Sequence, residues 1–309
     1  MGWTSKGKGS VEAQSNWLAE ADLGRAPNKP FMMADSSQGL AWNHRPPDQT
    51  NSKSKLIAEY IALFQKVTKG GLFIDGFSAP QSRNHEDAWT ARRVLEVEPK
   101  RLRRFWLCDM DASGLLQLQR LKSLHDQKPS WRHVHVMSGD FNRTIDTILV
   151  TGRITPKSAV FAFLDQRNME CEWATVKKIA EFRTRRKVEM MYFLGTGWLM
   201  RAIKSSTQPD QLAKIGRWWG NNGWQKTLDV NLYDFAQIFA SRFEHELGYR
   251  HVNAWPILMK AGEKKVAFFL IHASDHPQAP VLMGRAYRKI CGDIRRSPID
   301  SQIKLFDQK

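Results

Sequence analysis

Cysteine is scarce in this chain, and the few cysteines stand far apart. The sequence of 309 residues contains 3 of them, Cys108, Cys171 and Cys291. A disulfide framework or a cysteine metal site needs cysteines at close spacing, so neither is indicated. The 9 histidines are also spread along the chain, from His44 to His276. We therefore expect no bound metal ion.

Long apolar runs are absent as well. A helix that crosses a bilayer needs a run of about 18 or more apolar residues, and no such run occurs. Residues 1–16 also lack an apolar stretch of the kind found in signal peptides. These absences predict a cytoplasmic protein without a membrane segment.

Acidic residues are few relative to basic ones. Lysine and arginine total 47 against 31 aspartates and glutamates, which gives a formal net charge of +16. An excess of this size attracts polyanions, with nucleic acid first and an acidic membrane surface second. We expect nucleic acid as a partner, and the alternative is a basic surface that only keeps the protein in solution.

Apolar residues recur at two spacings that predict alternating strands and helices. The expected strands lie at 72–74, 105–108, 133–137, 159–164 and 188–194. The expected helices lie at 53–68, 88–97, 112–124, 142–150 and 173–182. Strands separated by helices imply parallel crossover units, and therefore an open sheet with helices on both faces.

The last two expected strands, 252–259 and 265–272, follow a different rule. Only five residues, Lys260 to Lys264, join them, and so short a connection permits an antiparallel hairpin but no crossover helix. The fold class is therefore α/β, with a doubly wound, Rossmann-like methyltransferase sheet that is mostly parallel and ends in an antiparallel hairpin.

The chain divides into five parts. Residues 1–48 are rich in Gly, Lys, Ser, Asn and Pro and predict a partly flexible arm. The remaining parts are a cofactor-binding core at 49–195, a helical insertion that acts as a substrate lid at 196–249, a hairpin and helix completing the core at 250–292, and a tail at 293–309.

Acidic residues follow the predicted parallel strands, where the ligand crevice of an open sheet lies. Asp75 follows the first strand, and the small residues Gly76 and Ser78 near it allow a backbone to approach a ligand closely. Asp109 is placed to accept both hydrogen bonds of a ribose diol. Asp140 is placed to accept a hydrogen bond from the exocyclic amine of adenine.

Phe77 and Phe141 adjoin these acids and complete the predicted adenosyl site. A single acid at a strand end is often only a helix N-cap, and this alternative stays open for each of them.

Asp165 follows the fourth strand and is the predicted catalytic group. A carboxylate there can accept a hydrogen bond from a nucleophilic amine and stabilise the charge that develops during transfer. Gln166 adds a donor, and Arg167 can bind a phosphate or a carboxylate bidentately. Alternatively, Arg167 pairs with Asp165 or Glu170 in a structural salt bridge.

Aromatic and basic residues alternate in the insertion, which predicts base stacking and phosphate contact there. The predicted substrate-binding residues are Arg201, Trp218, Trp219 and Trp224. Burial in a core is the alternative for the tryptophans. Two further basic clusters, 100–104 and 183–187, precede strands at the opposite edge of the sheet, and we expect them to be solvated turns.

Over about residues 49–292 the chain resembles the three-Cys-motif partner (TcmP) family, which is similar to class I S-adenosylmethionine (SAM) dependent methyltransferases. The matching positions are Thr50, Lys53, Phe73-Ile74-Asp75-Gly76-Phe77-Ser78-Ala79-Pro80, Gly139-Asp140-Phe141, Phe163-Leu164-Asp165-Gln166-Arg167, Glu170-Cys171, Trp173, Gly220, Trp224, residues 269–277 and Met283. The loop after the first strand lacks the GxGxG run of ordinary methyltransferases. At Asp165-Gln166-Arg167 many relatives have Asp-Pro and an aromatic, which would stack on a flipped base.

The resemblance implies SAM as cofactor and a partner protein whose three cysteines hold an iron-sulfur cluster. With the basic charge, it predicts a SAM-dependent methyltransferase that acts on nucleic acid or a nucleotide-derived substrate. One alternative is a non-catalytic module that binds nucleic acid or a partner protein. The other is a metal-dependent nuclease with ligands Asp75, Asp109 and Asp165, although these acids are dispersed for a two-metal site.

Overall fold

The computed structural model describes residues 48–80, 86–260 and 265–292. The predicted tail and all of the predicted arm except Asp48 lie outside the described residues. Asp48 itself is the first residue of a long helix, α1 (Asp48–Val67).

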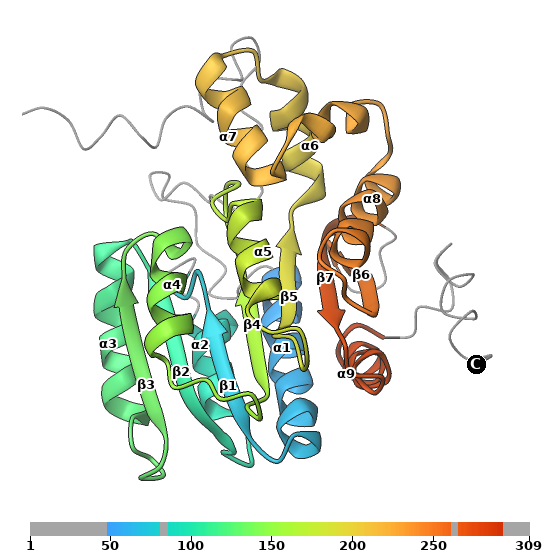
Figure 1. Cartoon of the computed structure of the whole chain (residues 1–309). Coiled ribbons are helices and arrows are strands. Elements are labelled where there is room, and N and C mark those ends of the chain that lie inside the picture. Colours follow the sequence, from blue (N-terminus) through green and yellow to red (C-terminus); the bar gives the residue numbers. More distant parts are fainter. Residues whose placement is uncertain (1–47, 81–85, 261–264, 293–309) are drawn as a thin grey trace, which may run out of the picture.

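A single sheet of seven strands forms the centre of the molecule (Figure 1). The strands are β1 (Gly71–Asp75), β2 (Leu102–Asp109), β3 (His133–Ser138), β4 (Val160–Leu164), β5 (Glu189–Leu194), β6 (His251–Leu258) and β7 (Val266–Ser274). Their order is β3-β2-β1-β4-β5-β7-β6, in which β1 to β5 run parallel to one another and β7 is antiparallel to both β5 and β6. The predicted α/β fold, with its mostly parallel sheet and antiparallel hairpin, is confirmed.

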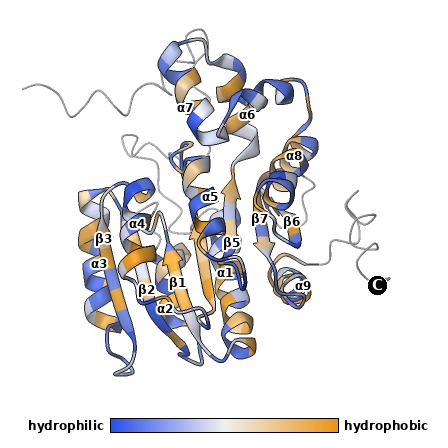
Figure 2. Ribbon diagram, in the orientation of Figure 1, coloured by the Kyte–Doolittle hydropathy of each residue, from blue (hydrophilic) through white to orange (hydrophobic). Residues whose placement is uncertain are grey.

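Helices cover both faces of this sheet, and each face has its own apolar core. One core joins α1, α2 (Thr90–Glu96), α3 (Ala112–His125) and α9 (Ala279–Cys291) to the sheet. The other core joins α4 (Phe141–Thr151), α5 (Trp173–Glu181) and α8 (Leu232–His245) to the opposite face. Because both faces are covered, β4 and β5 are buried at every position, and Figure 2 shows the central strands in the hydrophobic colour.

The predicted insertion consists of helices in two different positions. Figure 1 shows α6 (Thr196–Ser205) and α7 (Pro209–Trp219) beyond the carboxyl end of β5, whereas α8 lies beside β6 and β7. The short helix η4 (Asn222–Thr227) joins α7 to α8, and another short helix, η3 (Glu86–Ala88), precedes α2. Only α6 and α7 therefore have the position of a cover over the ligand edge, while α8 is part of a helical layer.

The start of β2 differs from the prediction. Gly71 pairs with Leu102 and Leu72 with Arg104, so Arg103 and Arg104 belong to the strand and not to a turn before it. Pairing with β1 extends β2 beyond its apolar centre, which the sequence pattern alone did not show.

No helix in the described ranges combines the length and the apolar character that crossing a membrane requires.

Candidate cofactor site at the carboxyl edge of the sheet

Three carboxyl groups lie at the centre of the sheet's carboxyl edge. Asp75 and Asp109 are the last residues of β1 and β2, and Asp165 directly follows β4. The strand order places β1 between β2 and β4, so Asp75 stands between the other two acids. The structure thus brings together three residues that are far apart in the sequence.

Asp75 is almost completely buried, with 1% of its surface exposed. Burial away from water raises the pKa of its carboxyl group to about 8, and the negative charges of Asp165 and Asp109 add to this increase. The backbone N–H of Phe77 opposes it by donating a hydrogen bond to Oδ1 at 3.2 Å. Asp75 is therefore mainly protonated at neutral pH, and a nearby cation would favour its ionised form.

The loop after β1 bends tightly against α4. An added Cβ at Gly76 would lie 2.9 Å from ring atoms of Phe141, so no side chain fits there without displacing the ring. The rings of Phe77 and Phe141 are also in contact, with centroids 5.7 Å apart. Ser78 is buried, and its backbone N–H donates to the carbonyl of Cys108 at 2.8 Å. The predicted residues 76–78 therefore follow Asp75 in one loop, and Phe141 of α4 packs against Gly76 and Phe77 of this loop.

Asp109 connects this loop to β2. Its Oδ2 accepts the backbone N–H of Ala79 at 2.7 Å, and its Oδ1 accepts the backbone N–H of Asp111 at 3.0 Å. The residue is half-buried, and each carboxylate oxygen has a second lone pair that a ligand hydroxyl can use. The contact with a ribose diol stays a prediction.

Asp140 is exposed and caps the N-terminus of α4. Its Oδ1 accepts hydrogen bonds from the backbone N and from Nδ2 of Asn142, at 2.9 and 2.8 Å. The capping role, which the sequence left open, is therefore present. Its contact with an adenine amine stays a prediction.

Asp165 forms a buried salt bridge with Lys53 of α1. Nζ of Lys53 donates to both carboxylate oxygens, at 2.7 and 2.6 Å, and the exposed fractions of the two side chains are only 2% and 10%. The ammonium group also lies 4.9 Å from the centre of the Phe193 ring. The predicted catalytic acid therefore has an internal countercharge.

Lys53 was not predicted as a site residue, although a signal for it was present. It lies at the start of the amphipathic segment 53–68, three and four residues before Leu56 and Ile57, and therefore on the buried side of the helix. Lysine is almost never fully buried unless it is paired. A lysine in the apolar stripe of a helix therefore indicates a buried acid elsewhere in the fold.

Gln166 is directed into the core rather than into the crevice. Its amide nitrogen donates to the hydroxyl of Tyr192, and its Oε1 accepts the backbone N–H of Cys171 at 3.0 Å. Trp218 donates to the same tyrosine hydroxyl through Nε1 at 2.8 Å. Since both ends of the amide are occupied, the geometry indicates that Gln166 supports the loop after β4.

Arg167 spans the loops that follow β1 and β4. Its Nη2 lies 3.4 Å from the carbonyl oxygens of both Ala79 and Pro80. Its backbone N–H donates to Oε2 of Glu170 at 3.2 Å. Within the described residues, the guanidinium forms no salt bridge with Asp165 or Glu170. These long contacts leave the half-buried Arg167 at the rim of the crevice.

Three of the four predicted substrate-binding residues lie in the core. Trp218, Trp219 and Trp224 have exposed fractions of 0%, 3% and 6%. The ring of Trp218 is stacked on Phe239, with centroids 5.1 Å apart and an angle of 12° between the planes. These rings pack, which is the alternative that the sequence left open, and only Arg201 is exposed.

The acids do not converge as metal ligands would. Among the described residues, no group of three or more His, Cys, Asp or Glu side chains could hold a metal ion. The geometry therefore does not support the metal-dependent nuclease.

Comparisons with known proteins add little to this description. No family model matches the sequence, and no curated protein matches it. Among solved structures, the chain is similar to a DUF574 family protein from Streptomyces avermitilis MA-4680, with 12% sequence identity and a TM-score of 0.40 over 74% of this chain and 83% of that chain. The likeness is remote, so the fold assignment rests on the strand order, and membership of the TcmP family stays a prediction.

Proposed function

We propose that this chain is a SAM-dependent methyltransferase that binds its cofactor at the carboxyl edge of β1 and β2. The observation that carries the proposal is the group of three carboxyl groups at this edge, in which the buried Asp75 stands between Asp109 and Asp165. Burial raises the pKa of Asp75, and the negative charges of Asp165 and Asp109 add to the increase. SAM carries a sulfonium and an ammonium group, and these positive charges would favour the ionised form of Asp75. The resemblance to the TcmP family supports the same cofactor.

Each predicted residue has a distinct task in this proposal. Asp75 faces the positively charged part of the ligand, Asp109 accepts from the ribose diol, and Asp140 accepts from the adenine amine. Because Gly76 has no side chain, the loop backbone can lie close to Phe141 of α4, and the backbone of 76–78 can line the site. When bound, the cofactor supplies an electrophilic methyl group.

Asp165 and Arg167 would act on the substrate. A carboxylate oxygen of Asp165 accepts a hydrogen bond from the nucleophilic amine and orients it, while Lys53 holds the carboxylate in position. Arg167 at the rim would bind a phosphate group, which fits a nucleic acid or a nucleotide-derived substrate. The formal net charge of +16 supports the same substrate class.

Calorimetric titration with S-adenosylhomocysteine tests the first step. We expect binding by the wild type and a large loss of affinity in Asp109→Ala. The matched control is Asp146→Ala, which removes an exposed acid of α4 that pairs with Lys178. No detectable binding at millimolar ligand by folded wild-type protein would contradict the proposal.

The buried salt bridge favours a second candidate, a non-catalytic module that kept the fold. In this case Lys53 would occupy Asp165 permanently, and no nucleophile would reach it. Transfer of a labelled methyl group to nucleic acid separates the two candidates. Activity in the wild type that is lost in Asp165→Asn supports the enzyme, whereas nucleic-acid binding without transfer in both proteins supports the module.

A further inference from the structure

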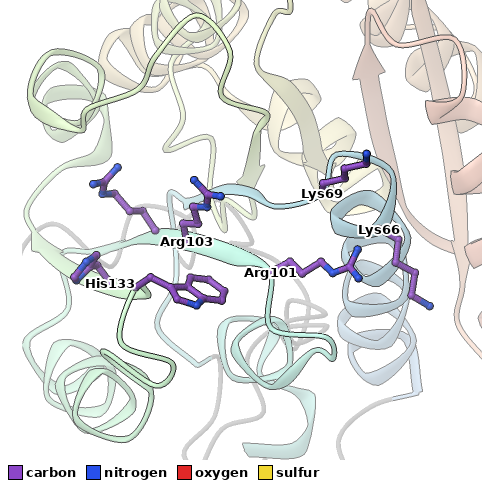
Figure 3. Close-up of a pocket in the computed structure, with 7 residues that line it drawn as sticks. Lys66, Lys69, Arg101, Arg103 and His133 are labelled. Carbon is purple, nitrogen blue, oxygen red and sulfur yellow. The ribbon is translucent and has the colours of Figure 1, made fainter.

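A hollow of about 940 Å³ lies at the amino edge of the sheet, opposite the candidate cofactor site. Its lining consists of Lys66, Lys69, Arg101, Arg103, Arg104, Trp131 and His133. Figure 3 shows the labelled side chains around it, which come from the last turn of α1 and the residues after it, from the start of β2 and the residue before it, and from the first residue of β3. Three segments that are distant in the sequence therefore form one concave surface.

The charge of this hollow has one sign. Five of its seven lining residues are lysines or arginines, and none is acidic. The ion pairs of the described residues all involve other cations, including the neighbouring Lys100, which lies 3.5 Å from Glu98. Unpaired like charges held in a concavity create a strong positive potential, which a bound polyanion neutralises.

Stabilisation of a neighbouring helix or strand explains only a small part of this cluster of cations. Lys66 lies in the last turn of α1, where a cation is favourable beside the partial negative charge of the helix end. Arg103 and Arg104 lie in β2, and no comparable need exists there. The solvated turn expected for 100–104 is thus wrong for these two strand residues, whose side chains line the hollow together with Arg101.

Trp131 is the aromatic member of the lining, and 46% of its surface is exposed. Its neighbour Arg132 is buried, donates to the carbonyl of Leu95 at 2.7 Å and lies 4.5 Å from the centre of the Phe105 ring. The backbone of Arg132 also bonds to both Gln127 and Pro129. The turn that carries Trp131 is therefore held in place, and its indole is presented to solvent beside the cations.

We propose that this hollow binds single-stranded nucleic acid. The cations contact successive phosphates, and Trp131 stacks on an unpaired base, because every base has a flat face and cationic grooves with exposed aromatics suit single strands. The concave shape favours a nucleic-acid strand as the ligand. An acidic membrane would instead be bound by a flat or projecting basic surface. This site lies at the opposite edge from the candidate cofactor site, and its occupation does not depend on the proposed methyltransferase activity.

Fluorescence anisotropy with a labelled oligothymidylate of about 15 nucleotides tests this proposal, since such a length fits one binding surface. We expect Trp131→Ala to weaken binding about 5- to 150-fold, the range that follows from the loss of one stacked base. We expect Arg101→Ala/Arg103→Ala to reduce the slope of log K against log salt by about 1.4, because two phosphate contacts are lost. A duplex of equal length should bind the wild type more weakly.

A matched control removes two exposed cations elsewhere, in Lys55→Ala/Lys177→Ala. Equal losses in the two double variants, or unchanged binding in Trp131→Ala, would overturn the proposal. Binding to phosphatidylserine vesicles that depends on the arginines, without binding to the oligonucleotide, would assign the hollow to a membrane instead. Titration of the same variants with S-adenosylhomocysteine should be unaffected, so failure of this site and failure of the proposed function are distinguishable.

Discussion

The Asp75→Asn substitution should stabilise the protein, and the gain should increase with pH. Burial raises the pKa of Asp75 to about 8, whereas an unfolded chain has an aspartate pKa of about 3.9. Between these values the folded protein holds a proton that the unfolded chain has released. The free energy of unfolding of the wild type, relative to that of the variant, is therefore highest below about pH 4. It falls as the pH rises from about 4 and reaches its lowest value above about pH 8.

The size of the effect follows from the difference between the two pKa values. Each pH unit within the window lowers the free energy of unfolding of the wild type by about 1.4 kcal/mol relative to asparagine. At pH 7, about three units above the unfolded value, the difference reaches roughly 4 kcal/mol. Any cost of placing the asparagine amide in the site shifts all values equally and leaves the slope unchanged.

Urea denaturation at pH 5, 6, 7 and 8, followed by circular dichroism, measures this slope. The control is Asp146→Asn, which makes the same change of side chain at an exposed position on α4. A stability difference for Asp75→Asn that does not depend on pH would refute the reasoning, because it would mean that Asp75 is ionised in the folded protein at neutral pH. We also expect the variant to bind SAM more weakly, since it lacks the negative charge.

The remaining predictions concern packing and the buried salt bridge. Lys53→Met should lower the free energy of unfolding by about 3–5 kcal/mol, since it leaves Asp165 buried without a countercharge, and Lys53→Met/Asp165→Leu should recover most of the loss. Equal instability of the single and double variants in urea denaturation would show that the two charges are not coupled. Trp218→Ala should cost about 3–5 kcal/mol and lower the melting temperature, because its ring is fully buried. A loss of nucleic-acid affinity at unchanged stability would contradict its packing role.

Local patterns in the sequence were sufficient to predict the elements of the sheet. Buried strands appear as short apolar runs, and the run at 188–194 became β5 with a boundary shift of one residue. The short link after Lys260 left no room for a crossover, so the antiparallel direction of β7 followed from chain length alone. The positions of Asp75 and Asp109 at strand ends were predicted from the ends of the apolar runs.

Side-chain partners across the fold were not predictable from such patterns. Lys53 and Asp165 are 112 residues apart, and their pairing depends on how α1 packs on the sheet. Gln166 turns inward because Tyr192 of β5 accepts its hydrogen bond, and that tyrosine belongs to a neighbouring strand. The sequence placed a polar residue at this position but could not show its direction.

The amino acid sequence by itself determined the order and type of the elements, the acids at the carboxyl edge and the excess of positive charge. Tertiary structure decided which of these groups meet. It paired Asp165 with an internal lysine, buried Trp218, and joined Arg101, Arg103 and Trp131 into one hollow. The physical reason is that backbone pattern is set by neighbours in the chain, whereas burial, charge pairing and pKa depend on groups that only folding brings within a few ångströms of one another.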